Sequence, residues 1–217
     1  MTERHLRLAA LLAALLIAGC GGSSTPPAVD GPAPSAGPTG ALSSERLRSM
    51  LLQKADLPGL PRLRAFAGAE LTTQATPQLA LCKGTAPTGP HQVANVIAES
   101  DVPGRVKVFE IVSVYTDEPA AKAAFARVVA DAKACATYTA DGVAHRVTEL
   151  APVQLGPGVD GVHYALVTAD VISGDIRTIA RKGTALVLIS GFGATPSGQP
   201  LLTYQAEAMR KALARLP

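Results

Sequence analysis

The stretch RVKVFEIVSVYTDEPAAKAAFARVVADAKAC, residues 105–135, contains the clearest strand pattern in the chain, followed directly by a helix pattern. In its first half, valines alternate with a second set of largely apolar side chains, so both faces of a strand would be apolar in part. The valines are Val106, Val108, Val112 and Val114, and the alternating residues are Lys107, Phe109, Ile111 and Tyr115. This two-sided pattern predicts a strand in the centre of a sheet.

The second half of the stretch predicts a helix that lies on this sheet. Asp117 is a residue type that caps helix N-termini, and Pro119 falls in the first turn, where its missing N–H costs no hydrogen bond. Apolar residues then recur at helical spacing along one side. This stripe consists of Phe125, Val128, Val129, Ala132 and, at its end, Cys135.

Further strand patterns occur on both sides of this unit, at residues 66–74, 93–99, 143–150, 162–171, 176–181 and 184–190. Short turns are predicted at Lys182-Gly183 and at Ser173-Gly174-Asp175. Because strands joined by such short turns pair antiparallel, we predict an antiparallel sheet.

Two more helices are predicted, one at each end of the folded part. Ser43 or Ser44 can cap the first, which Pro58-Gly59 would end. The last covers about residues 199–216, and its apolar face consists of Leu201, Tyr204, Ala208, Met209, Ala212, Leu213 and Leu216. The predicted fold class is therefore α+β, with helices packed on an antiparallel sheet in a single domain, residues 43–217.

The N-terminus has the pattern of a bacterial export signal. Arg4 and Arg7 precede an apolar run, residues 8–18, that is well short of the ~20 residues needed to span a bilayer. Ile17-Ala18-Gly19-Cys20 resembles the bacterial lipobox. The resemblance implies removal of residues 1–19 as a signal peptide, lipidation of Cys20 and acylation of the new N-terminus. The alternative is an ordinary signal peptide, or a short hydrophobic anchor, with a chance cysteine.

A lipid on Cys20 would place the protein at the cell membrane, on its extracytoplasmic face. Several acyl chains hold a protein firmly, since each buried methylene contributes ~0.8 kcal/mol. Residues 20–42 are rich in Gly, Pro, Ser and Thr and carry one acid, Asp30. Such a segment cannot bury enough apolar surface to offset its ordering entropy, so we predict a disordered linker.

Two cysteines remain after Cys20, namely Cys82 and Cys135. In an oxidising compartment an even pair predicts a structural disulfide. The alternatives are two buried free thiols or a redox pair. The chain contains no C-x-x-C, which speaks against redox catalysis.

Composition argues against nucleic acid as a partner. The formal net charge is only +3 at pH 7, the basic residues are spread evenly, and Trp is absent. No phosphate-binding or G-x-S-x-G motif is complete, because Pro196 stands where G-x-G-x-x-G needs its third glycine.

The sequence also contains no recognisable catalytic or metal-binding motif. His91, in a Pro-rich loop, and the predicted strand residues His145 and His163 do not have the spacing of metal ligands, and we expect the strand histidines to be half exposed. Three acids could face one cleft, but we expect them to lie at solvated strand edges: Glu99, Asp101 and Glu110. We therefore predict no metal site, no cofactor and no enzymatic activity.

Four segments resemble actinobacterial sensor-domain lipoproteins, which are related to the extracellular sensor domain of certain mycobacterial serine/threonine kinases. They are LLQKADLPGL (51–60), LALCKG (79–84), VSVYTDEPAAKAAFARVVADAKAC (112–135) and RKGTALVLISGFG (181–193). The resemblance spans about residues 46–217 and implies an antiparallel sheet, flanking helices and a cleft for an unidentified ligand. It transfers no binding residues. Unlike the kinase-borne domains, this chain has one cysteine pair in place of two, and no Trp.

Three functional hypotheses follow. The leading one is a membrane-anchored, sensor-like module that binds a small-molecule or protein ligand. The second is a carrier of lipid or another apolar ligand in the cell envelope, suggested by strands that are apolar on both faces. The third is a scaffold that docks an envelope protein.

Overall fold

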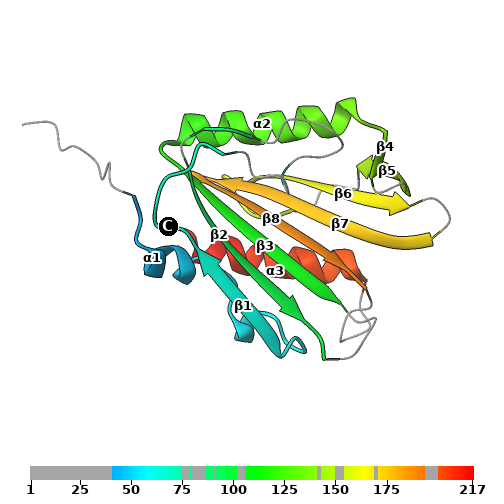
Figure 1. Cartoon of the computed structure of the whole chain (residues 1–217), viewed down its shortest axis with the longest axis horizontal. Helices are drawn as coiled ribbons and strands as arrows, with labels where there is room; N and C mark the ends of the chain where they lie inside the picture. Colours follow the sequence, from blue (N-terminus) through cyan, green and yellow to red (C-terminus); the bar gives the residue numbers. More distant parts are fainter. Residues whose placement is uncertain are drawn as a thin grey trace, which may run out of the picture. The chain divides into compact units, whose positions relative to one another are not determined.

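Eight strands of the described chain form one antiparallel sheet in the order β1-β2-β3-β8-β7-β6-β5-β4 (Figure 1). The computed structural model describes residues 41–74, 79, 87–89, 91–101, 106–140, 143–149, 154–168, 171–193 and 200–217. The strands are β1 (Arg62–Ala67), β2 (His91–Glu99), β3 (Lys107–Tyr115), β4 (Thr137–Ala140), β5 (Val143–Glu149), β6 (Asp160–Thr168), β7 (Val171–Lys182) and β8 (Ala185–Phe192). The helices are α1 (Ser44–Ser49), the short 3₁₀ helix η1 (Lys54–Asp56), α2 (Glu118–Ala134) and α3 (Leu201–Arg215).

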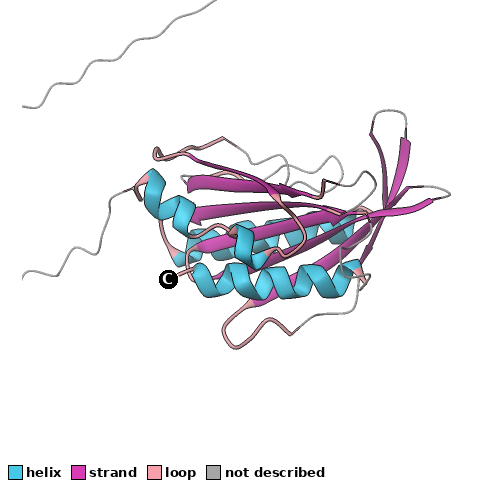
Figure 2. Cartoon of the chain, turned by 90° about the horizontal axis from the view of Figure 1, so that it is seen from below, coloured by secondary structure: helices cyan, strands magenta, loops and turns pink. Residues whose placement is uncertain are grey.

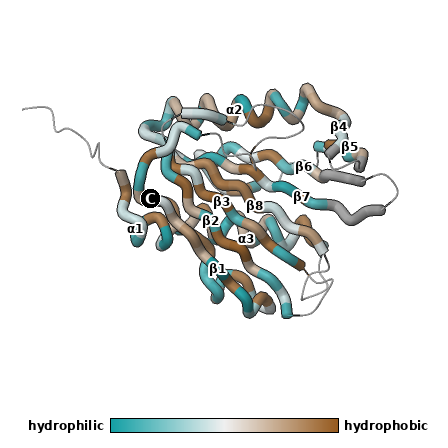
Figure 3. The backbone as a smooth tube through the Cα atoms, viewed as in Figure 1, coloured by the Kyte–Doolittle hydropathy of each residue, from teal (hydrophilic) through white to brown (hydrophobic). Residues whose placement is uncertain are grey.

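Helices cover both faces of this sheet, and the predicted α+β class is confirmed. Helix α2 lies on one face, here the α2 face, and α1 and α3 pack on the other, the α3 face (Figures 1 and 2). Strand β3 lies between β2 and β8, so the prediction of a central strand is also confirmed. Its Val108 and Val112 belong to the core beneath α1 and α3, whereas Ile111 and Tyr115 belong to the core beneath α2. Hydrophobic residues accordingly concentrate along the central strands (Figure 3).

The first helix is shorter than predicted. Ser43 caps it as expected, since its side-chain oxygen accepts a hydrogen bond from the Arg46 N–H at 3.1 Å. However, α1 ends at Ser49, well before Pro58. The Leu52 N–H donates to the Glu110 carboxylate of β3 at 2.7 Å. A tertiary hydrogen bond thus takes the place of the next helical one.

Several strand boundaries also differ from the prediction. The predicted strand 66–74 is wrong in its bounds, because β1 runs from Arg62 to Ala67 along β2. Ser173-Gly174-Asp175 lies inside β7 and is not a turn. The turn after β7 is Gly183-Thr184, one residue later than predicted, because Lys182 pairs with Ala185. Strand β4 has only four residues and was not predicted.

The N-terminal end of α2 is fixed by the cap and by a buried arginine. The Asp117 side chain accepts a hydrogen bond from the Ala120 N–H at 2.8 Å, as predicted. Arg181 of β7 is buried and pairs with Glu118 at 3.0 Å and with Asp160 at 2.7 Å. With its start held above β7, α2 extends so that its last turn lies over β5 and β6.

Candidate functional site

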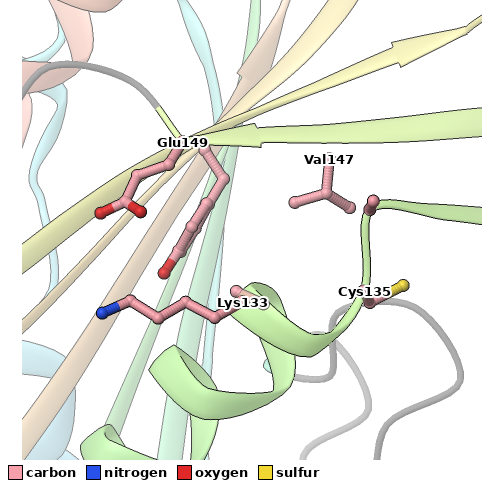
Figure 4. Close-up of a pocket in the computed structure, with 7 residues that line it drawn as sticks. Lys133, Cys135, Val147 and Glu149 are labelled. Atoms are coloured by element: carbon pink, nitrogen blue, oxygen red, sulfur yellow. The ribbon is translucent and has the colours of Figure 1, made fainter.

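A cleft of about 240 Å³ opens where α2 ends above β5 and β6 (Figure 4). Its walls come from the end of α2 and the segment after it, and its floor comes from two neighbouring strands. The lining residues are Ala132, Lys133, Cys135, Ala136, Val147, Glu149 and Tyr164. The Val147 N–H donates to the Ala136 carbonyl at 2.9 Å, which ties the end of α2 to β5.

The floor residue Tyr164 carries a buried hydroxyl group that has no hydrogen-bond partner in the described structure. Its side chain is only 1% exposed. Burial and, to a lesser extent, the negative charge of Glu149 raise the pKa of Tyr164 to about 12, so the hydroxyl is protonated and can donate. A buried polar group without a partner is costly, and such groups in native proteins often mark a ligand or water site.

Two opposite charges flank the cleft. Lys133 comes from the last turn of α2, and Glu149 lies in β5 directly opposite Tyr164 of β6. Figure 4 shows the ammonium and the carboxylate extending toward the same side of the cleft, whereas the Cys135 sulfur points the other way. Neither charged group has an ion pair or hydrogen bond with another described residue.

The predicted lipidation and disulfide sites are only partly within the described residues. Cys135 directly follows α2 and is its C-cap residue. Cys20 and Cys82 lie outside the described residues, so the lipid anchor and the Cys82–Cys135 pairing stay predictions.

The three acids singled out in the sequence do not share a cleft, and the expected position at a solvated strand edge was wrong for Glu110. Glu99 binds Lys107 on the α2 face at 2.6 Å, and Asp101 binds Arg62 at 2.6 Å. Glu110 points to the opposite face, because it is separated from Lys107 by an odd number of strand positions. There it is 0% exposed, and burial raises its pKa to about 8.

The expectation of half-exposed strand histidines holds for His145 but was wrong for His163. His145 is partly exposed and stacks on Tyr138 with ring centroids 4.9 Å apart. His163 is 1% exposed beneath α3, where its Nδ1 lies 2.9 Å from the Thr178 hydroxyl. Thr178 in turn donates to the Gln205 side chain at 3.3 Å.

His91 is also buried, and it begins β2 where a loop was predicted. No group of three His, Cys, Asp or Glu side chains within the described ranges could hold a metal ion.

Sequence reasoning did not single out Tyr164, Lys133 or Glu149 as site residues. Alternation along β6 puts Tyr164 and His163 on opposite faces of the sheet, but it carries no sign that the tyrosine hydroxyl lacks a partner. The pairing of Glu149 with Tyr164 depends on the register of β5 and β6. No local signal could have revealed it.

None of the described helices is both long enough and apolar enough to cross a membrane. No family model and no curated protein matches the chain.

Solved structures with a similar fold include the following two. One is the extracellular domain of PknH from Mycobacterium tuberculosis, at 17% identity and a TM-score of 0.50, covering 82% of this chain and 98% of that one. The other is an uncharacterized protein from Mycobacterium smegmatis, the Rv0999 ortholog, at 12% identity and a TM-score of 0.51, covering 78% of this chain and 95% of that one. At sequence identities of 12–17%, this similarity shows a shared fold and nothing further. The chain thus has a fold like that of the PknH extracellular domain, in agreement with the resemblance noted in its sequence.

Proposed function

We propose that this protein is a membrane-anchored, extracytoplasmic, sensor-like module that binds a small polar molecule in the cleft at the end of α2. The observation that carries this proposal is the buried, unpartnered hydroxyl of Tyr164 in the lining of that cleft. A bound polar ligand would supply the missing partner. The fold likeness to the PknH extracellular domain supports a module of this kind outside the cytoplasm.

The size and lining of the cleft favour this function over a lipid carrier. The cleft volume of about 240 Å³ is smaller than the roughly 300–1,000 Å³ of pockets for drug-sized ligands. The cleft therefore suits a smaller molecule and is too small for an acyl chain. The lining includes an ammonium, a carboxylate and a phenol, whereas an acyl chain needs a long apolar cavity. The strands that are apolar on both faces are accounted for by the two cores beneath the helices.

Binding at the cleft is tested by titrating the full-length ¹⁵N-labelled chain with butyrate, butylammonium, glycerol and 4-aminobutyrate. We expect at least one probe to shift the backbone amide signals of Lys133, Val147 and Glu149 in a saturable way. Tyr164→Phe is expected to weaken that binding at least fivefold, because the hydroxyl is lost. The same variant should stabilise the ligand-free chain by about 1–3 kcal/mol, since it removes a buried group without a partner.

Tyr204→Phe is the matched control for this experiment. The Tyr204 hydroxyl is likewise buried without a partner among the described residues, but it belongs to the core beneath α3. Tyr204→Phe should therefore stabilise the chain without changing probe affinity. If none of these four probes, and none of the further zwitterions described below, shifts the cleft amides, the proposed binding function is wrong.

The membrane anchor is proposed on the lipobox-like sequence that ends at Cys20. Acyl chains on this residue would hold the folded part at the membrane through the linker. We expect Cys20→Ser to move the protein from the membrane fraction to the soluble fraction, as followed by fractionation and immunoblotting. Cys82→Ser serves as the control and should leave the protein with the membrane. Retention of Cys20→Ser in the membrane fraction would contradict lipid anchoring.

The Cys82–Cys135 disulfide is also part of this proposal. Leu79 is buried in the same core cluster as Ala132. Each of these residues precedes a cysteine by three positions, which supports the pairing of Cys82 with Cys135. A crosslink here would tie Cys135, which follows α2 and lines the cleft, to the segment that carries Cys82.

A further inference from the structure

The cleft at the end of α2 is bordered by one cation and one anion that do not neutralise each other. Lys133 and Glu149 form no ion pair, although both extend to the same side of the cleft (Figure 4). Other opposite charges in the described chain do form ion pairs, such as Lys107 with Glu99 and Arg215 with Asp56. The cleft therefore offers two unused charges of opposite sign.

A ligand with a single charge would be matched by only one of these groups. A simple anion that approaches Lys133 also meets the carboxylate of Glu149, and a simple cation that approaches Glu149 also meets the ammonium of Lys133. A molecule with both charges can satisfy both groups at once. In the lining of the same cleft, the Tyr164 hydroxyl is a buried donor without a partner among the described residues.

The rest of the lining and the size of the cleft limit what lies between the ligand's charges. Ala132, Ala136 and Val147 present small apolar surfaces that suit a few methylene groups. A volume of about 240 Å³ holds a molecule of amino-acid size.

We propose that the cleft binds a small zwitterion, a molecule of amino-acid size that carries one carboxylate and one ammonium group. Its carboxylate binds Lys133 and the Tyr164 hydroxyl, and its ammonium binds Glu149. This assignment rests on the proposed function, because it names the ligand class for the same cleft.

The test compares three probes with the same four-carbon skeleton on the full-length chain at low ionic strength. They are 4-aminobutyrate with both charges, butyrate with the negative charge alone, and butylammonium with the positive charge alone. Affinities come from the amide shifts of Lys133, Val147 and Glu149. We expect 4-aminobutyrate to bind at least tenfold more tightly than either singly charged probe. Glycine, 3-aminopropanoate and 6-aminohexanoate then measure the preferred distance between the charges.

Two variants assign the contacts. Lys133→Gln should bring the affinity of 4-aminobutyrate down to that of butylammonium, because the carboxylate no longer has its partner. Glu149→Gln should bring it down to that of butyrate. Lys122→Gln is the control, since Lys122 is an exposed lysine of the same helix outside the cleft, and it should change nothing.

The outcomes separate this inference from the proposed function. If butyrate or butylammonium binds as tightly as the zwitterions, the ligand class is wrong but the cleft is still a binding site. If glycerol binds but none of the zwitterions does, the ligand class is likewise wrong and the cleft is still a binding site. If no probe of either set shifts the cleft amides, both proposals fail.

Discussion

Glu110→Gln is expected to stabilise the protein at pH 8 and to remove a pH dependence of its unfolding free energy. Glu110 lies at the centre of the sheet and is 0% exposed. One carboxyl oxygen accepts the Leu52 N–H at 2.7 Å, and the other has no partner in the described structure. Glutamine keeps an acceptor for Leu52 but cannot ionise. The substitution therefore separates the hydrogen bond from the cost of a buried charge.

The direction follows from the raised pKa. Burial raises the pKa of Glu110 from 4.5 to about 8, while the hydrogen bond from Leu52 and then Arg215 lower it and Asp56 raises it by smaller amounts. Between these pH values the folded state binds more protons than the unfolded state. The contribution of Glu110 to stability is therefore complete below about pH 4.5 and is lost as pH rises to 8.

The magnitude is set by the size of the pKa change. A pKa difference of one unit between the folded and unfolded states corresponds to ~1.4 kcal/mol of unfolding free energy. A single group can therefore change the unfolding free energy by at most ~1.4 kcal/mol per pH unit. At pH 8 the loss in the wild-type chain amounts to at most about 4 kcal/mol. Glu110→Gln should be more stable than wild type by up to that amount at pH 8, and the gain should shrink as pH falls toward 5.

Urea unfolding followed by circular dichroism at pH 5, 6, 7 and 8 measures this difference. Comparing variants at each pH cancels the opposite contribution of His163, whose pKa burial lowers and which favours the folded state as pH rises. Glu99→Gln is the control, because the hydrogen bond from Lys107 lowers the pKa of Glu99. It should leave the slope between pH 5 and 8 unchanged. An equal slope in wild type and Glu110→Gln would show that Glu110 is not a buried acid of raised pKa.

Cys135→Ser is expected to lower the unfolding free energy by ~4 kcal/mol, because the proposed crosslink closes a loop of about 54 residues and restricts the unfolded chain. Cys82→Ser should cost the same amount. The double variant should cost no more than either single variant, since removing one sulfur already breaks the bond. Chemical unfolding of the four proteins under non-reducing conditions measures these values.

Reduction provides an independent check on the crosslink. Dithiothreitol should destabilise the wild-type chain by the same ~4 kcal/mol and should leave both serine variants unchanged. Cys20→Ser, in the linker, should unfold like wild type. Additive losses in the double variant, or two free thiols by intact mass in unreduced mature protein, would rule out the pairing.

The parts of the fold that follow from local pattern were predictable. The alternation in 106–115 identified β3, and the apolar face of 199–216 identified α3, because side-chain direction within one element depends only on its own periodicity. Asp117 marked the start of α2 because an N-cap acts within one turn.

Errors arose where distant segments compete for backbone groups. The segment after Ser49 has helix-forming residues, but the Leu52 N–H is taken by Glu110 from 58 positions away. Ser173-Gly174-Asp175 has turn-forming residues, but pairing with neighbouring strands extends β7 through them.

The sequence by itself determined the class of fold, the central strand, the helix that covers it and the predicted export and lipidation pattern, because each depends on residues close together in the chain. Only the tertiary structure decided which polar groups are buried and which meet. Lys133, Glu149 and Tyr164 come from three elements, and they border one cleft because strand register and the packing of α2 bring them together. The physical reason is that burial and pairing are properties of contacts between segments, and periodicity within one segment carries no record of its neighbours.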